Sequence, residues 1–466
     1  MKGKNVMSMS KVLTRAIVSM LVLAMMMAGC SSEKPLLKDL DEEKEVTLRI
    51  LTNMDRMSFR NFYGGLFGIQ YSNIDIELIP FDERYSSNLD SIVALEANIS
   101  RVRPDVVFLS PDAYERLAVE HKLYNLETII RQEQFDVDTF LPGLIDWIRK
   151  KSGGALYGLA PSFMGKVLFY NADLFHQYGV ELPHDGMTWD DVLKLAARFR
   201  NEGSSNDEVS GLYVWDIEAA IFDISMNLGL KLVDSKGERM LIQSESWKRV
   251  FGQTVEAIQN RDIRPQFSIA NNGVIKEERS DLFLAGRAAM KLDWNMSVFS
   301  LQRGNIQGGN NYAFDWGVVT APIDPFRPGE TPYIQIPNIM AIPIEAEHKR
   351  EAWEFIKFSN GPEKVERGLR YFPFEMMTRG LSKKTKDYNK LETFYKLRMS
   401  QDRDSRPYPV NVPDSFTEPF DKLLNQVLTR MIRKDVTVEQ GINELDIKGN
   451  ELLKQARASQ NGGGQH

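Results

Sequence analysis

Tryptophan stands beside acidic and amide side chains at two places where a strand is expected to end. One place follows the expected strand Ala288–Leu292, and the other follows an expected strand at Leu212. The residues concerned are Asp293, Trp294 and Asn295 at the first place and Tyr213, Trp215 and Asp216 at the second. Aromatic rings stack on the C–H faces of sugars, while planar polar groups bond the hydroxyls in the ring plane. The two clusters are therefore candidates for holding a neutral polyhydroxylated solute.

Short apolar strands alternate with helices along much of the chain. The first strands are expected at Val46–Leu51, Asp75–Ile79 and Asp105–Leu109, with helices at Phe59–Gln70, Arg84–Ile99 and Pro111–Glu120. The pattern continues with strands at Leu156–Leu159 and Val167–Tyr170 and a helix at Trp189–Arg200 that Thr188 opens. Further helices are expected at Glu245–Gln259, Lys276–Ala285 and His348–Ser359, and two more within Phe420–Ala458. This alternation predicts an α/β protein with a buried, largely parallel sheet covered on both faces.

The first thirty residues have the features of an export signal. A basic start precedes an apolar run from Ala16 to Met27, and Ala28-Gly29 then leads to Cys30, the single cysteine. Such a segment is typical of a secretory signal, and the run is short for a membrane span. The position of Cys30 resembles the bacterial lipobox, in which the signal is cleaved before a lipidated cysteine. The resemblance implies removal of residues 1–29, an acidic tether over 30–45 and a lipid anchor at the outer face of the cytoplasmic membrane.

Composition excludes several classes of protein. Residues 1–29 hold four of the 58 basic and none of the 64 acidic residues, so the remainder has a net charge of −10. Such an acidic chain is a poor candidate for binding nucleic acid. One cysteine excludes an intramolecular disulfide and a thiolate metal cluster, and the five histidines are scattered. No metal and no cofactor are expected, and the remaining length suffices for two domains.

Several segments, in order, resemble the extracellular solute-binding proteins of ABC importers, in the family that includes maltose-type receptors. The earlier segments are Asp105-Val-Val-Phe-Leu109, Leu123-Tyr-Asn-Leu126, Leu156-Tyr-Gly-Leu-Ala-Pro161, Leu168-Phe-Tyr-Asn-Ala-Asp-Leu-Phe175 and Thr188-Trp-Asp-Asp191. The later ones are Phe283-Leu-Ala-Gly-Arg-Ala-Ala-Met290, Asp293-Trp294, Ala341-Ile-Pro343 and Ala352-Trp-Glu-Phe-Ile356. Each segment is weak alone, but the ordered set covers nearly all of the chain after the signal.

The resemblance implies a periplasmic-binding-protein type II-like fold, with two α/β lobes around a central cleft. Lobe 1 would comprise residues 46–161 and 322–372, lobe 2 residues 162–321 and 373–458, and residues 459–466 would form a flexible tail. The crossings between lobes are expected near Ala160–Met164, Thr320–Pro322 and Tyr371–Phe374. Two lobes joined in this way can close on a solute by hinge motion.

The resemblance also implies the site residues. It places Trp294 against the bound sugar and the aromatic residues near Trp215 as a second wall of the cleft. Further candidates at strand ends and crossings are Asp55, Arg56, Asp112, Phe163, Met164, Tyr333, Gln335 and Asn338. Where the family often carries a late C-terminal tryptophan, the segment Pro413–Pro419 has none, and Phe416 is the expected substitute.

These expectations favour a monomeric, non-enzymatic receptor that captures a sugar or oligosaccharide and delivers it to an ABC permease. One alternative is a receptor of the same fold for a peptide, polyamine or metal, or one that serves a membrane sensor. A more distant alternative is a secreted glycoside-acting enzyme, because carboxylate pairs are plentiful. The nucleophile elbow of hydrolases, the zinc-binding histidine pair and the phosphate-binding loop are all missing from the sequence.

Overall fold

The computed structural model describes residues 37–462, apart from 82–88, 201–208, 270–274, 278–280, 304–313, 363, 365–375, 382–387, 403–407 and 409–411. The expected signal, Cys30, the crossing at Tyr371–Phe374 and the end of the tail lie outside the described residues. None of the helices in the described part of the chain has the length and apolar character that a bilayer crossing requires.

The first sheet has the strand order β2-β1-β3-β14-β4. Its strands are β1 (Val46–Thr52), β2 (Ile74–Pro80), β3 (Val106–Leu109), β4 (Gly158–Leu159) and β14 (Ile339–Ala341). β1 pairs in parallel with β2 and β3, whereas β14 runs antiparallel to β3 and β4. Five of the seven residues of β1 are buried, as expected for a strand whose central part is covered on both faces.

Helices cover this sheet through aromatic contacts. The covering segments are α2 (Arg56–Phe59), the π-turn η1 (Arg60–Gly64), α3 (Gly65–Gln70), α4 (Leu89–Val102), α5 (Pro111–Val119), α6 (Glu127–Gln132), α7 (Leu144–Lys151) and α13 (Lys349–Ser359). Phe59 of α2 stacks on Phe355 of α13 with ring centroids 5.9 Å apart, and Phe67 of α3 meets Phe355 edge-on at 5.2 Å. These contacts join the start of the chain to a helix nearly three hundred residues later.

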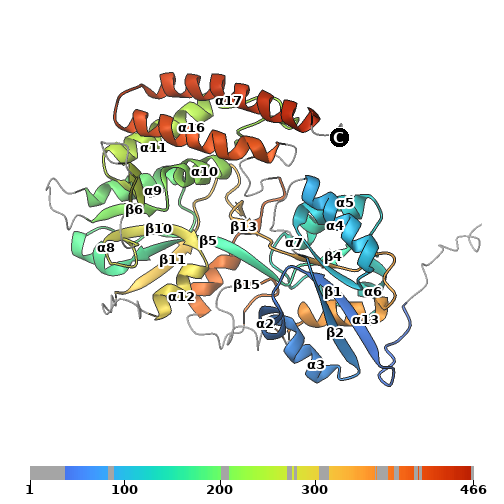
Figure 1. The fold of residues 1–466 in the computed structure, drawn as a ribbon. Helices are drawn as coiled ribbons and strands as arrows, with labels where there is room; N and C mark the ends of the chain where they lie inside the picture. The colour runs from blue at the N-terminus through green and yellow to red at the C-terminus, as the bar shows by residue number, and fades with distance from the viewer. Residues whose placement is uncertain are drawn as a thin grey trace, which may run out of the picture.

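The second sheet has the order β11-β5-β10-β6-β7. Its strands are β5 (Ser162–Asn171), β6 (Ser210–Val214), β7 (Ile263–Pro265), β10 (Ala288–Trp294) and β11 (Trp316–Thr320), and the short strands β13 (Ile334–Gln335) and β15 (Met376–Met377) pair with the start of β5. The helices of this part are α8 (Ala172–Tyr178), α9 (Trp189–Ala196) continued by η2 (Ala197–Phe199), α10 (Ile217–Asn227), α11 (Glu245–Gln259), α12 (Met296–Arg303), α16 (Asp414–Ile432) and α17 (Val438–Gly462). In Figure 1, α9, α10 and α11 lie over the second sheet, and α16 and α17 lie beyond them. The remaining short elements are β8 (Phe267–Ile269), β9 (Ile275–Glu277), β12 (Glu330–Thr331), β16 (Arg398–Met399), α15 (Tyr388–Leu391) and η3 (Glu392–Tyr395).

The chain passes between the sheets along β5 and along the segment before β14. β4 ends in the first sheet at Leu159, and three residues later β5 begins its run into the second sheet. The return starts after β11 ends at Thr320 and reaches the first sheet at Ile339. This return is longer than the expected crossing at Thr320–Pro322, because β12 and β13 lie within it.

Most expected elements are present, with shifts at their ends. The capping box at Thr188 and Asp191 opens α9, and the last segment forms two helices. The expected helix Lys276–Ala285 is wrong. Its start belongs to β9, which pairs with β8, and Asp281 then accepts backbone N–H bonds from Phe283 and Leu284 in a turn.

The expectation of largely parallel sheets is also wrong. In each of the two sheets, two of the four pairings along the strand order are antiparallel. The antiparallel pairings involve β5 and β14, which the chain enters from the other sheet, and β11, the last strand before the chain returns. β5 and β14 arrive without the helical crossover that parallel neighbours need, because the chain reaches each of them from the other sheet.

Candidate functional site

The two tryptophan clusters lie at the same end of the second sheet, where the neighbouring strands β6 and β10 have their carboxyl ends. β10 and β6 run parallel with Lys291 opposite Tyr213, so Asp293 and Trp215, each two residues further along, follow at the carboxyl ends of these strands. β5 runs antiparallel to β10 and brings Lys166 opposite Trp294. Since carboxyl ends of neighbouring strands are where open α/β sheets bind ligands, this edge is the candidate site.

The tryptophans at this edge are accessible. Trp215 is 58% exposed, which is high for so large an apolar ring. Trp294 is half-buried at the end of β10, and the Nζ atom of Lys166 lies 5.0 Å from its ring centroid. An exposed indole and a half-buried one at the same end of the sheet offer apolar faces for stacking on a solute.

Lys166 forms an ion pair with a carboxylate of α10. Its Nζ donates to Asp223 Oδ1 at 2.6 Å, and only 14% and 11% of the two side chains are exposed. Burial raises the pKa of Asp223, and the nearby carboxylates of Asp293 and Asp216 act in the same direction, whereas Lys166 opposes them. The ammonium of Lys166 thus pairs with Asp223, on which the carboxylates of Asp293 and Asp216 also act.

A second lysine holds Asp293. Lys291 is buried and bonds both Asp281, at 2.6 Å, and Asp293, at 2.5 Å. Burial alone would lower the pKa of Lys291, but the two carboxylates outweigh it and raise the pKa. Ser297 also donates to Asp293. Asp293 is therefore fixed by groups beneath the surface.

Acidic groups continue from this edge to α16. Asp216 caps the N-terminus of α10 by accepting from the Ala219 N–H at 2.5 Å. Burial, together with the charges of Asp216 and Asp421, raises the pKa of Glu218 to about 7, although a hydrogen bond with Asn425 opposes the shift. Burial likewise raises the pKa of Asp421, whose carboxylate accepts from the Tyr408 hydroxyl at 2.6 Å.

Glu218 should make stability fall as the pH rises. The folded chain keeps a proton on Glu218 up to about pH 7, whereas the unfolded chain loses it near its ordinary pKa of 4.5, so the folded state binds more protons in between. Allowing for solvent screening of this half-buried group, the free energy of unfolding of the wild type should drop by about 1–2 kcal/mol more than that of Glu218→Gln between about pH 5 and pH 8. Urea unfolding at both pH values measures this difference.

The matched control for this prediction is Glu451→Gln, at an exposed position of α17. It should keep the pH dependence of the wild type. A Glu218→Gln variant whose pH dependence also matches the wild type would show that Glu218 titrates normally.

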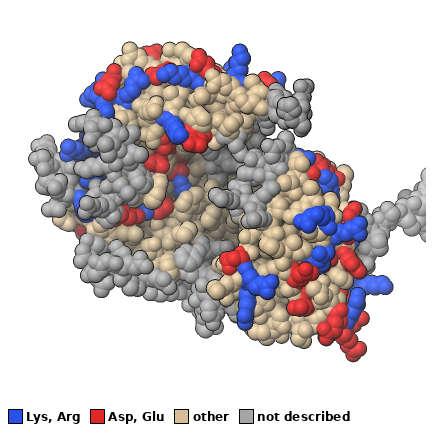
Figure 2. Space-filling model, in the orientation of Figure 1, with Lys and Arg blue, Asp and Glu red and all other residues tan. Residues whose placement is uncertain are grey.

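The molecule is hollowed between the part that carries the second sheet and the part that carries the first. Figure 2 shows this hollow from one side, with acidic and basic side chains on its wall. The half-buried residues Met164, Gln335 and Asn338 belong to the segments that join the two sheets, and Met164 pairs with Gln335. The structure thus places these three expected residues between the sheets.

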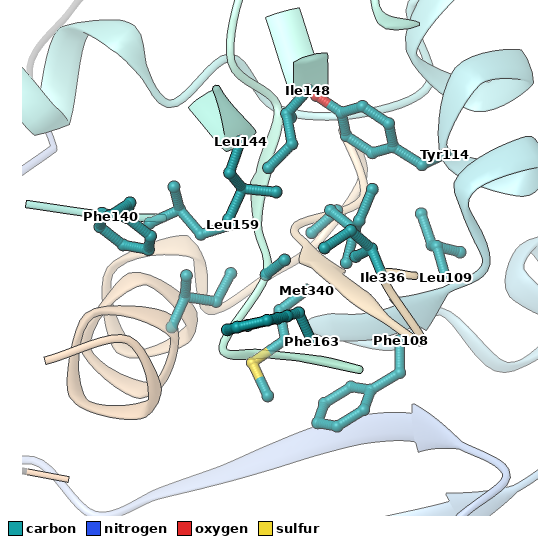
Figure 3. Packing of buried hydrophobic residues seen from close by; sticks show 14 of the residues in the cluster. Phe108, Leu109, Tyr114, Phe140, Leu144, Ile148, Leu159, Phe163, Ile336 and Met340 are labelled. Carbon is teal, nitrogen blue, oxygen red and sulfur yellow. The ribbon is translucent and has the colours of Figure 1, made fainter. Parts of the chain in front are cut away.

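Four expected aromatic residues lie in the core and are not exposed in the hollow. Phe163, Tyr213, Tyr333 and Phe416 are all fully buried. Phe163 packs among residues of the first core, close to Met340 and Phe108 (Figure 3), and meets Tyr395 edge-on at 5.3 Å. Phe416 stacks on Phe420 at 5.1 Å in the core of the second part, so it does not replace a tryptophan platform.

Two of the buried residues hold the backbone of the site. The Tyr333 hydroxyl donates to the Asp223 carbonyl at 2.6 Å and accepts from Trp189 Nε1 at 2.8 Å, and the Tyr333 carbonyl accepts from the Lys166 N–H at 3.0 Å. Asn295 is also buried, and its Oδ1 accepts from the Gly165 N–H at 3.2 Å. In the structure these side chains act as supports. Tyr213 has a similar place, since it donates to Gln266 at 2.6 Å.

Three expected residues belong to the first sheet. Asp55 caps α2 after β1, where bonds with Ser58 and Met57 lower its pKa, and Asp112 is buried in the first turn of α5 after β3. Because β1 and β3 are parallel neighbours, these groups share the carboxyl edge of the first sheet. Arg56 lines a groove of about 560 Å³ between α2–α3 and the edge strand β2. The tryptophans lie on the other sheet.

Sequence reasoning missed Lys166, Asp223 and Glu218. Lys166 lies in β5 between Gly165 and Val167, and Asp223 lies in the middle of the apolar helix α10. Each is a charged residue within a largely buried segment. That isolated charge was the available signal, because buried charges are normally paired. Among the described residues, no cluster of histidine, cysteine and acidic side chains is arranged to hold a metal ion. The two indole rings can stack on an apolar face of a solute, and the carboxylates beside them can accept hydrogen bonds from its hydroxyls.

Sequence comparison places the chain near one protein family. The family model of the bacterial extracellular solute-binding proteins matches residues 70–388. No curated protein matches the chain in sequence.

Solved structures share the architecture over nearly their whole length. A sugar transporter from Rhizobium etli in an open conformation has a TM-score of 0.63 at 17% identity, over 87% of this chain and 99% of its own. The sugar-binding protein MalE from Xanthomonas citri has a TM-score of 0.59 at 17% identity, over 88% and 98%. An ABC substrate-binding protein from Listeria monocytogenes in complex with cycloalternan has a TM-score of 0.54 at 17% identity, over 88% of this chain and 100% of its own. At such identities the likeness is one of fold.

Proposed function

Because this chain belongs to the bacterial extracellular solute-binding proteins, we propose that it captures a sugar or oligosaccharide between its two sheets and delivers it to an ABC permease. The observation that carries the sugar assignment is the pair of tryptophans at one sheet edge. Trp215 is largely exposed, Trp294 is half-buried, and Asp216 and Asp293 stand beside them. Stacking faces next to hydrogen-bond acceptors are what a sugar ring requires.

The fold supports this function. The predicted α/β architecture of the type II periplasmic binding proteins is confirmed by the solved structures, among them one in an open conformation. The division into lobe 1 (46–161 and 322–372) and lobe 2 (162–321 and 373–458) is part of our proposal. The two passages between the sheets would act as hinges, and closure would enclose the solute between the tryptophans and the edge that carries Asp55 and Asp112.

The bound solutes of structural neighbours also favour a carbohydrate. The Listeria protein holds cycloalternan, and a further neighbour of 19% identity and TM-score 0.54 is described with mannotriose bound. Both molecules are oligosaccharides. We propose the same class of ligand for this chain, without enzymatic turnover.

The family places the protein outside the cytoplasm, and we propose a lipid anchor at Cys30. The sequence before this cysteine resembles a lipobox, and residues 31–45 would then link the lipid to β1. Labelling of cells with a fatty-acid analogue tests the anchor: the wild-type chain should become labelled and Cys30→Ser should not. An unlabelled wild type would contradict the anchor and leave the solute assignment unchanged.

The solute is found by thermal unfolding of the purified Cys30→Ser chain. The panel should contain mono- and oligosaccharides, amino acids, polyamines and metal ions, with chemical analysis of every compound that raises the midpoint. A rise with one class of sugar, recovered intact, is the expected result. A rise only with non-sugars, or consumption of the sugar, would contradict the proposal.

A further inference from the structure

The candidate site contains more acidic than basic groups. Asp216 and Asp293 adjoin the two tryptophans in the sequence and act electrostatically on Asp223, and Glu218 and Asp421 continue this acidic wall toward α16. Lys291 is already shared between Asp281 and Asp293 beneath the surface. Among the described groups that act on Asp223, Lys166 is the cation that opposes the negative charges of Asp216 and Asp293.

The position of Lys166 is set by contacts on both sides of it. The Gly165 N–H donates to Asn295 Oδ1, and the Gly165 carbonyl accepts from the Asn295 N–H at 2.9 Å. Tyr333 accepts from the Lys166 N–H and also bonds the backbone of Asp223. The lysine and its acid are therefore held together before any solute arrives, because the same buried groups hold both backbones.

The ammonium also faces the ring that is proposed to stack on the solute. Its distance of 5.0 Å from the Trp294 centroid is within the range of a cation–π contact. A solute cation placed near this ring would meet a like charge, whereas a neutral sugar would not. Most of the Lys166 and Asp223 side chains is buried, so solvent screens the charge of Lys166 only weakly.

We propose that Lys166 determines the charge class of the solute: it offsets the charge of Asp223 and places an ammonium beside Trp294, and so makes the site accept neutral sugars and reject amino sugars. This inference rests on the proposed function. It assigns Lys166 a role in selecting between neutral and cationic solutes. A purely structural ion pair with Asp223 would not have that role. Removal of its charge should take away the like charge beside Trp294 and increase the excess of negative charge, so that the site favours cationic solutes.

The first test compares neutral sugars with their amino counterparts. Calorimetry would give the dissociation constants of glucose and glucosamine, and of cellotriose and the glucosamine trisaccharide, for the wild type, Lys166→Met and Lys166→Arg. In Lys166→Met the ratio of the two constants should shift toward the amino sugar by about tenfold or more, because one like charge has been removed. Lys166→Arg should keep the wild-type ratio. Lys194→Met, at an exposed position of α9, is the matched control and should also keep it.

A parallel loss of affinity for both members of a pair in Lys166→Met would overturn the proposal, because a purely structural lysine would weaken both alike. An unchanged ratio would overturn it as well. If no sugar binds to any variant, the sugar assignment fails, and the second test decides the role of Lys166.

The second test needs no solute. Lys166→Ala removes the side chain beyond Cβ, and n-propylammonium has the shape and charge of the missing part. Propylammonium should raise the unfolding midpoint of Lys166→Ala by more than it raises that of Lys194→Ala. 1-Propanol should not produce this difference. Equal effects of the amine and the alcohol, or no effect of either, would show that no cation is required there and would overturn the proposal.

Discussion

Trp294→Ala should weaken binding of the solute by about 1–3 kcal/mol, or roughly 5- to 150-fold, because a buried aromatic contact of this kind contributes that much. Trp294 ends β10 at the edge where Trp215 and Lys166 also lie. It is only half-buried in the ligand-free chain, so its removal should change affinity more than stability. Calorimetry with the sugar identified by the thermal panel measures the effect.

Trp316→Ala is a close control for this prediction. Trp316 is also half-buried in the second sheet, at the start of β11, and Lys390 lies 3.7 Å from its ring centroid. It pairs with Asn171, at the opposite end of β5 from Lys166. Its loss should leave affinity unchanged. Equal affinity of Trp294→Ala and the wild type would remove Trp294 from the site.

Phe163→Ala should lower the free energy of unfolding by about 3–5 kcal/mol, the usual range for removing a buried phenylalanine. Phe163 is fully buried in the first core cluster and contacts Tyr395 edge-on (Figure 3). It lies on β5 next to the point where the chain enters the second sheet, so the cavity would open where the sheets join. Urea unfolding measures the loss.

Met164→Ala is the matching variant, because successive side chains of a strand point to opposite faces. Met164 is half-buried, so Met164→Ala should lower the free energy of unfolding by less than Phe163→Ala does. The opposite ranking, or a Phe163→Ala variant of nearly wild-type stability with reduced affinity, would place Phe163 in the site and contradict its core position.

Local patterns in the sequence predicted the elements well, for physical reasons that act within a few residues. Apolar periodicity and the cap at Thr188 are local, and α9 and α11 therefore appear where expected. The helix expected at Lys276–Ala285 failed because its first residues pair with β8, a contact that periodicity does not report. The same limit made Phe416 a candidate ligand group, although α16 turns it into the core.

The sequence by itself determined the α/β class, the order of most helices and strands, and the acidic and aromatic clusters after Leu212 and Leu292. Each of these features depends only on residues that are close together in the sequence. Only the tertiary structure decided which of these residues meet. The parallel register of β10 and β6 brings Trp215 and Asp293 to the same end of the sheet, and the antiparallel pairing of β5 with β10 places Lys166 opposite Trp294. Pairing between distant strands also decides burial, which is why Tyr213 and Tyr333 support the site from within the core while Trp215 remains exposed.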